Sequence, residues 1–324
     1  MKVLYALCAV LLLFGCNRTE TALSVPPSFY PSAIAYDAAR GLHYIGSFAN
    51  GEIAVVDEAG DRVGTLRAAT PGDRVVRLAI EVRERKLWAA TSNAIEVFHL
   101  DRPDLLRQIY PVGTSMQYAD FAVAPHGVVY LLDRSEGLVR RLDTRRAELH
   151  TVARLPREAM TGGGVHCSLT GEPGVAHVAG GALALMPGEE LLLAAYDERL
   201  YRVAIATGEV AQIPLHGPLT YVTQLIHRGT AFGRHEIVAI RGEASRITHL
   251  ALDADLQRLY RQESFHAASS APIAAAFDGT HVRMIAGPLR HHPVYCGDGR
   301  PTAPLRIIAH APKPVVSHQV LAMD

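Results

Sequence analysis

Short apolar stretches, often alternating with polar residues and broken by glycine, aspartate or asparagine, recur along most of the chain. Stretches of about four to eight residues between such turn residues predict β-strands. One pair runs from Gly41 to Ser47 and from Gly51 to Asp57, and a similar pair begins at Lys86. No long segment repeats with a helical period, so the pattern predicts an all-β fold without core helices.

The paired stretches form a repeat of about 44 residues that occurs six times along the chain. The equivalent apolar positions of the six repeats are Tyr44, Trp88, Tyr130, Leu193, Val238 and Met284. Strand-only repeats of this length are typical of β-propeller blades, each a four-stranded antiparallel sheet that buries both faces against its neighbours. The repeat therefore predicts a six-bladed β-propeller over residues 29–311.

One interval is longer than the others, because 63 residues separate Tyr130 from Leu193. The excess covers Pro156–Gly174 and includes His166 and Cys167. An insertion in a regular array forms a loop on one face, and such loops often carry binding. We expect an ordered loop between blades 3 and 4, and a linker without a function is the alternative.

Closure of the ring needs a strand from each end of the chain, because a closed propeller leaves no unpaired sheet edge. Two apolar segments lie outside the six repeats, Leu23–Phe29 and Leu305–His310. We expect these segments to pair and to complete the last blade. Residues 312–324 are expected to form a C-terminal tail.

The chain begins with a short apolar run, Val3–Phe14. This run is too short for a membrane-spanning helix, which needs about 20 residues, and it has the size of the apolar core of a signal peptide. With Gly15 before Cys16, the segment resembles a bacterial lipoprotein signal, which implies that residues 1–15 are removed and that Cys16 is lipidated. An ordinary secretory signal is the alternative. Residues 16–28 are then expected to tether the propeller to the membrane.

Asn17 stands in place of the aspartate that, in enteric bacteria, resembles an inner-membrane retention signal. We therefore expect the protein in the bacterial cell envelope, at the periplasmic face of the outer membrane.

Lysine plus arginine and aspartate plus glutamate both number 32, and no long block of one charge occurs. Without a basic face, the chain is not expected to bind nucleic acid. Its expected partners are the membrane, through the lipid, and an unidentified protein or small-molecule ligand.

Removal of the signal and lipidation leave two of the four cysteines, Cys167 and Cys296. A pair of cysteines in an oxidising compartment predicts a disulfide, and two independent thiols are the alternative. The bond would carry the long insertion across one face, close to His166, His291 and His292. Zinc or copper accepts imidazole and sulfur ligands, so a metal site is a second hypothesis, although the spacing matches no standard site.

The first repeat, Tyr30–Asp37 followed by Gly51–Ile53, resembles the opening blade of SMP-30/gluconolactonase-like propellers and, more distantly, strictosidine synthase-like and NHL-type proteins. The resemblance implies a six-bladed fold whose lactonases bind a divalent cation through Glu, Asn and Asp at the mouth of the central channel. This chain has Ser32 at the position of the Glu, and Asp120 lies one residue from another ligand position. The remaining aligned positions carry Val76, Ala119, Gly181, Thr223 and Ile273. Because calcium or a similar cation needs several oxygen ligands, we expect this hydrolytic site to be lost.

Polar residues near the inner ends of the blades are the candidates for a binding pocket at the channel mouth. They are Ser32, Tyr118, Asp120, Tyr221 and Gln224, joined by His166, His291 and His292 from the loops. The alternative role for each is turn capping or a hydrogen bond within the core. The leading hypothesis is a binding or scaffolding module, and no catalytic residue is assigned. A divergent metal-dependent lactonase or esterase, using calcium or another divalent cation, and a copper- or zinc-handling lipoprotein are the alternatives.

Overall fold

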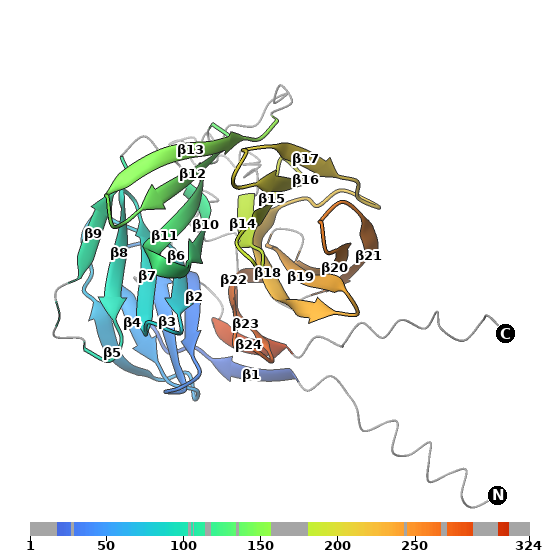
Figure 1. The fold of residues 1–324 in the computed structure, drawn as a ribbon. Helices are drawn as coiled ribbons and strands as arrows, with labels where there is room; N and C mark the ends of the chain where they lie inside the picture. Colours follow the sequence, from blue (N-terminus) through green and yellow to red (C-terminus); the bar gives the residue numbers. More distant parts are fainter. Residues whose placement is uncertain are drawn as a thin grey trace, which may run out of the picture.

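The architecture of the chain comes from a computed structural model. The structure describes residues 18–310 except 27–28, 103–104, 106, 114–117, 134–135, 157–180, 243–244, 267–270 and 288–303. These residues form six four-stranded antiparallel sheets that follow one another around a ring (Figure 1). Helical structure within them is limited to one 3-10 turn, Pro125–Gly127, and no helix there is long and apolar enough to cross a membrane. The predicted all-β propeller with six four-stranded blades is confirmed.

Each blade begins with its strand nearest the centre of the ring and continues outward. Blade 1 contains β2 (Pro31–Asp37), β3 (Leu42–Ser47), β4 (Ile53–Val56) and β5 (Arg62–Arg67). Blade 2 contains β6 (Val75–Glu81), β7 (Lys86–Thr91), β8 (Ala94–His99) and β9 (Gln108–Pro111). Blade 3 contains β10 (Tyr118–Ala124), β11 (Val128–Asp133), β12 (Leu138–Asp143) and β13 (Glu148–Arg154). Blade 4 contains β14 (Gly181–Leu185), β15 (Leu191–Tyr196), β16 (Arg199–Ala204) and β17 (Val210–Ile213). Blade 5 contains β18 (Val222–Ala231), β19 (Arg234–Arg241), β20 (Arg246–Asp253) and β21 (Leu259–His266). Blade 6 contains β22 (Ala271–Phe277), β23 (Val282–Gly287), β24 (Arg306–His310) and β1 (Arg18–Ala22).

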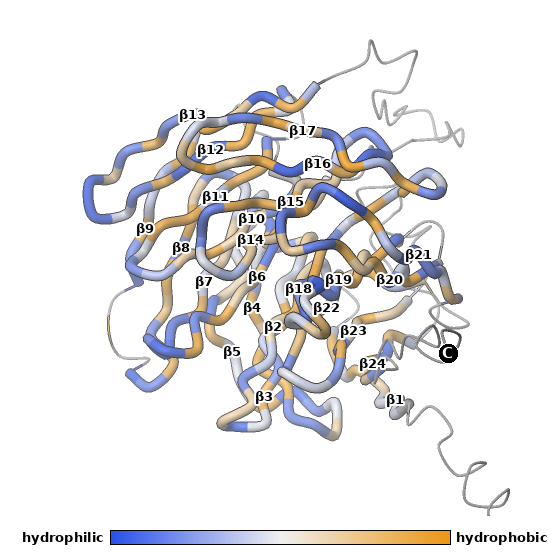
Figure 2. Tube along the Cα trace, turned by 45° about the vertical axis from the view of Figure 1, so that its right-hand side comes forward, coloured by the Kyte–Doolittle hydropathy of each residue, from blue (hydrophilic) through white to orange (hydrophobic). Residues whose placement is uncertain are grey.

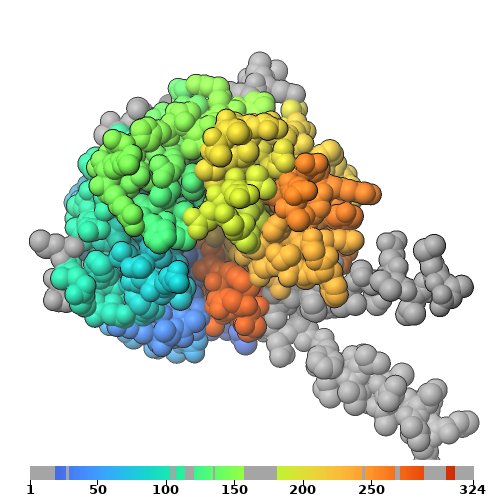
Figure 3. Space-filling model, in the orientation of Figure 1, coloured from blue at the N-terminus to red at the C-terminus, as the bar shows by residue number. Residues whose placement is uncertain are grey.

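Apolar side chains pack between neighbouring blades in six clusters, one at each interface around the ring. β15 shows how the sequence produces this arrangement. Leu193 and Ala195 pack toward blade 5, whereas Leu192 and Ala194 pack toward blade 3. Successive residues of a strand point to opposite faces, so a strand buried on both faces is apolar throughout. Hydrophobic positions are accordingly spread through all the blades (Figure 2), which follow one another in sequence order around the ring (Figure 3).

The ring closes through β1, the outermost strand of blade 6, which pairs with β24 from Arg18 opposite His310 to Ala22 opposite Arg306. The expected C-terminal partner, Leu305–His310, is confirmed by β24. The expected N-terminal partner, Leu23–Phe29, is wrong: the strand lies earlier, within the segment assigned to the tether.

The search for an apolar segment missed this strand, because an outermost strand is exposed to solvent and can consist of polar residues. Thr19 and Glu20 of β1 are exposed, so β1 has no apolar signature. Leu23 and Phe29 are buried instead as connecting residues in the cluster between blades 6 and 1. The backbone N–H of Leu23 donates to the carbonyl of Leu305 at 2.9 Å. The expected insertion and the tail at 312–324 lie outside the described residues.

The two faces of the ring are defined by the innermost strands, β2, β6, β10, β14, β18 and β22. We call the side on which these strands begin the upper face, and the side on which they end the lower face. The connection from β13 to β14 reaches the ring at the upper face, where Gly181 begins β14. The connection from β23 to β24 leaves from the same face, because β23 runs antiparallel to β22 and ends opposite its first residue. Both cysteine-bearing segments are thus attached at the upper face.

Candidate functional site

The channel wall is held together by polar side chains of the innermost strands. Asp120, in β10, is 1% exposed and accepts hydrogen bonds through both carboxylate oxygens. Its Oδ1 accepts from Arg77 Nε at 2.6 Å and from the backbone N–H of Phe121 at 2.9 Å. Its Oδ2 accepts from the backbone N–H of Leu183 at 3.0 Å. One carboxylate therefore joins blades 2, 3 and 4. Burial raises the pKa of Asp120, and Arg77 and the two amides oppose that rise.

Two further candidates make the same kind of connection. The Ser32 hydroxyl donates to the carbonyl of Val75, which joins blade 1 to blade 2. The Gln224 side chain holds Ala275 of blade 6 twice: its Nε2 donates to the carbonyl and its Oε1 accepts from the N–H at 2.8 Å. Ser32, Asp120 and Gln224 thus lie on innermost strands, and each is occupied in a bond between blades, so a binding role for them stays a prediction.

The remaining candidates fall into two groups. Tyr118 begins β10 at the upper face, and Tyr221 immediately precedes β18 there in the left-handed backbone region, with φ of 57°. The others lie outside the described residues: Cys16, His166, Cys167, His291, His292 and Cys296. The lipidation, the disulfide and the imidazole cluster therefore stay predictions from the sequence.

A hollow of about 450 Å³ opens at the upper face between blades 4 and 5. Its lining is Asp197, Glu198, Arg199, Gln212, Leu215, Gly217 and Pro218. The β15–β16 turn, Asp197–Glu198, places both residues at positive φ, a conformation that aspartate tolerates at hairpins. The backbone N–H of Leu219 donates to the carbonyl of Glu198 at 3.1 Å, which fixes the connection to blade 5 against the turn. The hollow is polar, with two carboxylates at its edge.

Sequence patterns do not reveal this hollow. Its residues come from a hairpin turn of blade 4 and from the connection that enters blade 5, and each segment alone resembles an ordinary turn. Gln262, in the outermost strand of blade 5, holds the connection that enters this blade. The Gln262 Nε2 donates to the carbonyl of Gly217 at 3.0 Å, and its Oε1 accepts from the N–H of His216 at 3.1 Å.

Two arginine networks, which sequence reasoning did not predict, join blades 1 and 2. At the upper face the Arg67 guanidinium binds both oxygens of Glu96, at 3.0 and 3.1 Å, and also contacts Asp73. The Arg67 and Glu96 side chains are 3% and 4% exposed. Burial alone would lower the pKa of Arg67, but these carboxylates raise it above its ordinary value.

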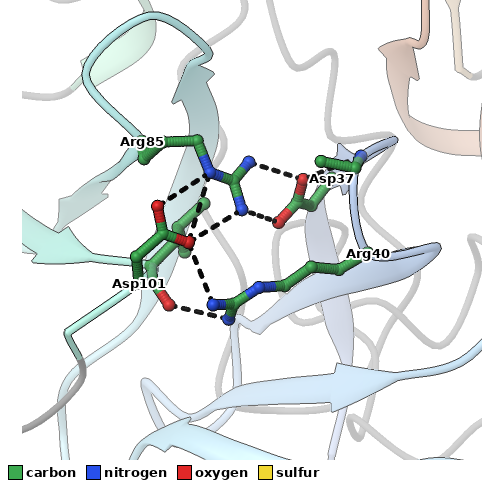
Figure 4. A network of polar contacts seen from close by, with 6 residues as sticks. Asp37, Arg40, Arg85 and Asp101 are labelled. Carbon is green, nitrogen blue, oxygen red and sulfur yellow. Dashed lines mark hydrogen bonds and ion pairs between the residues drawn. The ribbon is translucent and has the colours of Figure 1, made fainter.

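At the lower face, Arg85 bridges Asp37 of blade 1 and Asp101 of blade 2 (Figure 4). Both Arg85 contacts with Asp37 measure 2.7 Å. Arg40 adds a second contact with Asp101, at 2.9 Å. Both oxygens of Asp37 are taken up by Arg85, so this network also serves the interface and not an open site.

Three histidines in the blades are held neutral. His43, His227 and His249 each have the pKa lowered to about 4, first of all by burial. Nearby cations add to this effect: Arg283 at His43, and His310 with Arg228 at His249. Neutral imidazoles can bind metals, but the described part of the chain holds no group of three or more His, Cys, Asp or Glu placed to bind a metal ion.

Comparisons with known proteins place the chain by its fold. No family model matches the sequence, and no curated protein does so either. Among solved structures, selenomethionine-substituted virginiamycin B lyase from Staphylococcus aureus is 12% identical, with 92% of this chain and 100% of that chain covered and a TM-score of 0.55. A streptogramin B lyase structure is 13% identical over 91% of this chain and 97% of that chain, with a TM-score of 0.55. The Cps50 (Swd1) β-propeller domain of Myceliophteria thermophila is 13% identical over 91% and 100%, with a TM-score of 0.58.

This chain is a β-propeller. At 12 to 13% identity the likeness extends to the fold and no further. Two of these similar structures are lyases and the third is a Cps50 (Swd1) β-propeller domain. The function of this chain has to be argued from its own residues.

Proposed function

We propose that this chain is an exported lipoprotein, anchored through Cys16, whose six-bladed propeller is a binding module of the bacterial cell envelope. The apolar run that ends at Gly15 and Cys16 supports export and lipidation. The propeller supplies a rigid ring with loops at both faces, an arrangement that suits binding.

The observation that carries this proposal is the occupancy of the channel wall. Both carboxylate oxygens of Asp120 accept hydrogen bonds, from Arg77 and from backbone N–H groups. The oxygen and the nitrogen of the Gln224 amide both bond to the backbone of Ala275. A dication at the channel mouth needs several oxygen ligands that are free to turn toward it. These side chains hold the blades together instead, which favours binding at the upper face over metal-assisted hydrolysis in the channel.

We place the binding site in the upper-face hollow between blades 4 and 5. Two carboxylates, of Asp197 and Glu198, line the hollow against one guanidinium, of Arg199, and this balance favours a polar ligand that carries a cationic group. The described strands next to the connections that contain Cys167 and Cys296 end at this same face.

A divergent lactonase or esterase is the second candidate, supported by the first-blade resemblance to SMP-30/gluconolactonase-like propellers. A copper- or zinc-handling lipoprotein, using His166, His291, His292 and the two cysteines, is the third. Metal analysis of the purified mature protein separates them. Stoichiometric calcium would favour the hydrolase, stoichiometric copper or zinc the metal-handling protein, and a metal-free protein the binding module.

The anchor is tested by Cys16→Ala. We expect this variant to leave the membrane fraction and to appear in the soluble periplasm, because no acyl chains remain to hold it. Retention of the variant in membranes would refute lipidation as the anchor. The metal analysis and the fractionation are independent, so one part of the proposal can fail without the other.

A further inference from the structure

The hairpin formed by β18 and β19 extends farther from the ring than its counterparts. β18 has 10 residues, whereas the other innermost strands have five to seven. A register shift between His227 and Gly229 marks the point where the extension begins. Three extra residues of strand correspond to about 10 Å. Because β18 ends at the lower face, the extension projects from that face.

Phe232 occupies the tip of this hairpin, and two features of its position are unfavourable for an aromatic residue. Its side chain is 87% exposed, the largest value among the large hydrophobic residues described. Its φ of 52° lies in the left-handed region, where asparagine, aspartate or glycine is preferred in two-residue hairpin turns. A single exposed hydrophobic residue is common on protein surfaces, so the neighbours of Phe232 decide whether the tip is a binding surface.

The extension is braced, so Phe232 is held away from the ring. Imidazole Nε2 of His227 lies 3.1 Å from Nδ1 of His235. His235 Nε2 in turn lies 3.2 Å from the carbonyl oxygen of Ala254 in the neighbouring turn, and the Thr230 hydroxyl is 3.3 Å from His235 Nδ1. With its Nε2–H donated to Ala254, His235 accepts from His227 through Nδ1.

Arginine and a second aromatic ring surround the base of the tip. The guanidinium carbons of Arg234 and Arg258 lie 4.0 and 5.1 Å from the centre of the Tyr260 ring. Tyr260 is 40% exposed. Exposed aromatic residues flanked by arginine are typical of protein surfaces that lie at the headgroup level of a membrane. The cationic side chains suit anionic lipid headgroups.

This surface faces the part of blade 6 from which the N-terminal segment emerges. Arg234 and Val238 lie on the same side of β19, and Val238 packs against blade 6. His249, opposite Val238 on β20, has its ring centre 6.2 Å from that of His310. His310 is the last residue of β24 and pairs with Arg18, the first residue of β1. Figure 1 likewise places the beginning of β1 and the end of β24 toward blade 5.

The short chain between Cys16 and Arg18 limits how far a lipid on Cys16 can lie from the start of β1. Cys16 lies two residues before Arg18, and two residues of extended chain span at most about 7 Å. A lipid on Cys16 would therefore enter the bilayer close to the rim of blade 6 that adjoins blade 5.

We propose that Phe232, with Arg234, Arg258 and Tyr260, contacts the lipid bilayer in which Cys16 is anchored. The lower face of blade 5 then lies against the membrane, and the upper-face hollow between blades 4 and 5 points away from it. This inference rests on the proposed lipid anchor. Contact through both the lipid and the hairpin tip would fix the orientation of the propeller, which a single flexible anchor would not do.

The test compares two tryptophan variants of the full lipidated protein in vesicles of phosphatidylethanolamine and phosphatidylglycerol. Phe232→Trp reports on the hairpin tip. Val82→Trp is the matched control, because Val82 is 73% exposed at the lower-face turn of blade 2, away from blade 5. Trp88, the native tryptophan, is 2% exposed and gives the same background in both variants. Acyl chains brominated near the headgroup should quench the fluorescence of Phe232→Trp at least about twofold more than that of Val82→Trp.

Three outcomes would overturn the proposal. Equal quenching of the two variants would show that the tip has no special contact with lipid. No quenching of Phe232→Trp, combined with protection of its introduced tryptophan from iodide in native envelope membranes, would show that the tip binds a protein. Quenching that does not fall when phosphatidylcholine replaces phosphatidylglycerol would refute the part assigned to Arg234 and Arg258.

Failure of this inference is distinguishable from failure of the anchor. Mass spectrometry of the N-terminal peptide, in the same samples, reports whether Cys16 carries acyl chains. An unacylated chain refutes the anchor, whereas an acylated chain without quenching of Phe232→Trp refutes only the contact through the hairpin tip. Thermal melting of both variants checks that their folds are intact.

Discussion

The interface between blades 1 and 2 and the interface between blades 5 and 6 share apolar packing but differ in their polar chemistry. Between blades 1 and 2, permanent charges are paired: buried Arg67 with buried Glu96 near the upper face, and partly exposed Arg85 with buried Asp37 at the lower face. Between blades 5 and 6, the amide of Gln224 holds Ala275, and the imidazole of His249 lies near His310.

The second interface also leaves polar atoms unsatisfied. Within the described part of the chain, Nε of Arg228 and Nε2 of His249 are buried without a hydrogen-bond partner. A buried arginine keeps its charge and depends on nearby carboxylates, such as Glu236 at Arg228, whereas a histidine can lose its charge and be buried neutral. An interface between blades can therefore contain either paired charges or neutral polar groups. Which of the two it contains decides how its stability responds to mutation and to acid.

The largest effect is expected where a buried charge loses its partner. Arg67→Met leaves the carboxylates of Glu96 and Asp73 in a buried site without their main cation. We expect a loss of about 3–5 kcal/mol in the free energy of unfolding, measured by urea denaturation. Arg67→Lys, which keeps the charge but not the two-point contact, should lose less.

Arg154→Ala is the control for this comparison. Arg154 forms an ion pair with Glu136 in which both side chains are more than half exposed, so its removal should change stability by less than about 1 kcal/mol. If Arg67→Met cost no more than Arg154→Ala, the buried network would have no special part in joining blades 1 and 2.

Acid should act on the second interface. Folding lowers the pKa of His249 from 6.5 to about 4, so the unfolded chain takes up a proton first as the pH falls. The stability due to neutral His249 is present above about pH 6.5 and is lost as the pH falls toward 4. Urea denaturation over this range should show a smaller loss in His249→Gln than in the native protein, by up to about 3 kcal/mol.

The surroundings of His249 make this a strict test. Arg228, Arg261 and His310 oppose its protonation, and Glu263 favours it. His43 and His227 titrate in the same sense, so the native protein should lose stability in acid even in the His249→Gln variant. An identical pH dependence in variant and native protein would show that His249 is not held neutral by the fold.

The contrast between the interfaces also shows what could be predicted from the sequence. The six blades were predictable because every blade contains apolar strands in the same order. This order produces a repeat in the sequence. β1 was not found by its hydrophobicity, because residues such as Thr19 and Glu20 are exposed and the strand is joined to β24 along its whole length by backbone pairing. Strand pairing through the backbone leaves little trace in the side chains.

The candidate site was only partly predictable. Ser32, Asp120 and Gln224 lie on innermost strands, but most of their partners are backbone groups of other blades, such as Leu183 and Ala275. Backbone partners have no sequence signature. The Arg67–Glu96 pair was missed because the two residues come from different blades and no local pattern links them.

A smaller loss of stability is expected when the hydrogen bonds of the innermost strands are removed. Gln224 makes such bonds between blades 5 and 6, and Ser32 makes one between blades 1 and 2. Gln224→Leu removes a side chain that satisfies both the N–H and the carbonyl of Ala275, and buried groups left without partners cost about 1–3 kcal/mol. Ser32→Ala leaves only the carbonyl of Val75 without this donor and should cost about 1 kcal/mol. Urea midpoints of the two variants rank them, and equal losses would mean that the second hydrogen bond of Gln224 adds nothing.

The smallest effect is expected at the exposed edge of blade 6, where Glu20 of β1 meets Arg306 of β24 at 2.7 Å. The two side chains are 30% and 46% exposed, so water and salt screen the pair, and Glu20→Gln should lower stability by only about 0.5 kcal/mol. In about 1 M salt the difference from the native protein should vanish. Glu136→Gln, in the exposed pair with Arg154, should behave alike. Ring closure would then depend on the backbone pairing of β1 and on the burial of Leu23, whereas a loss above about 2 kcal/mol in Glu20→Gln would mean that this ion pair itself holds the ring closed.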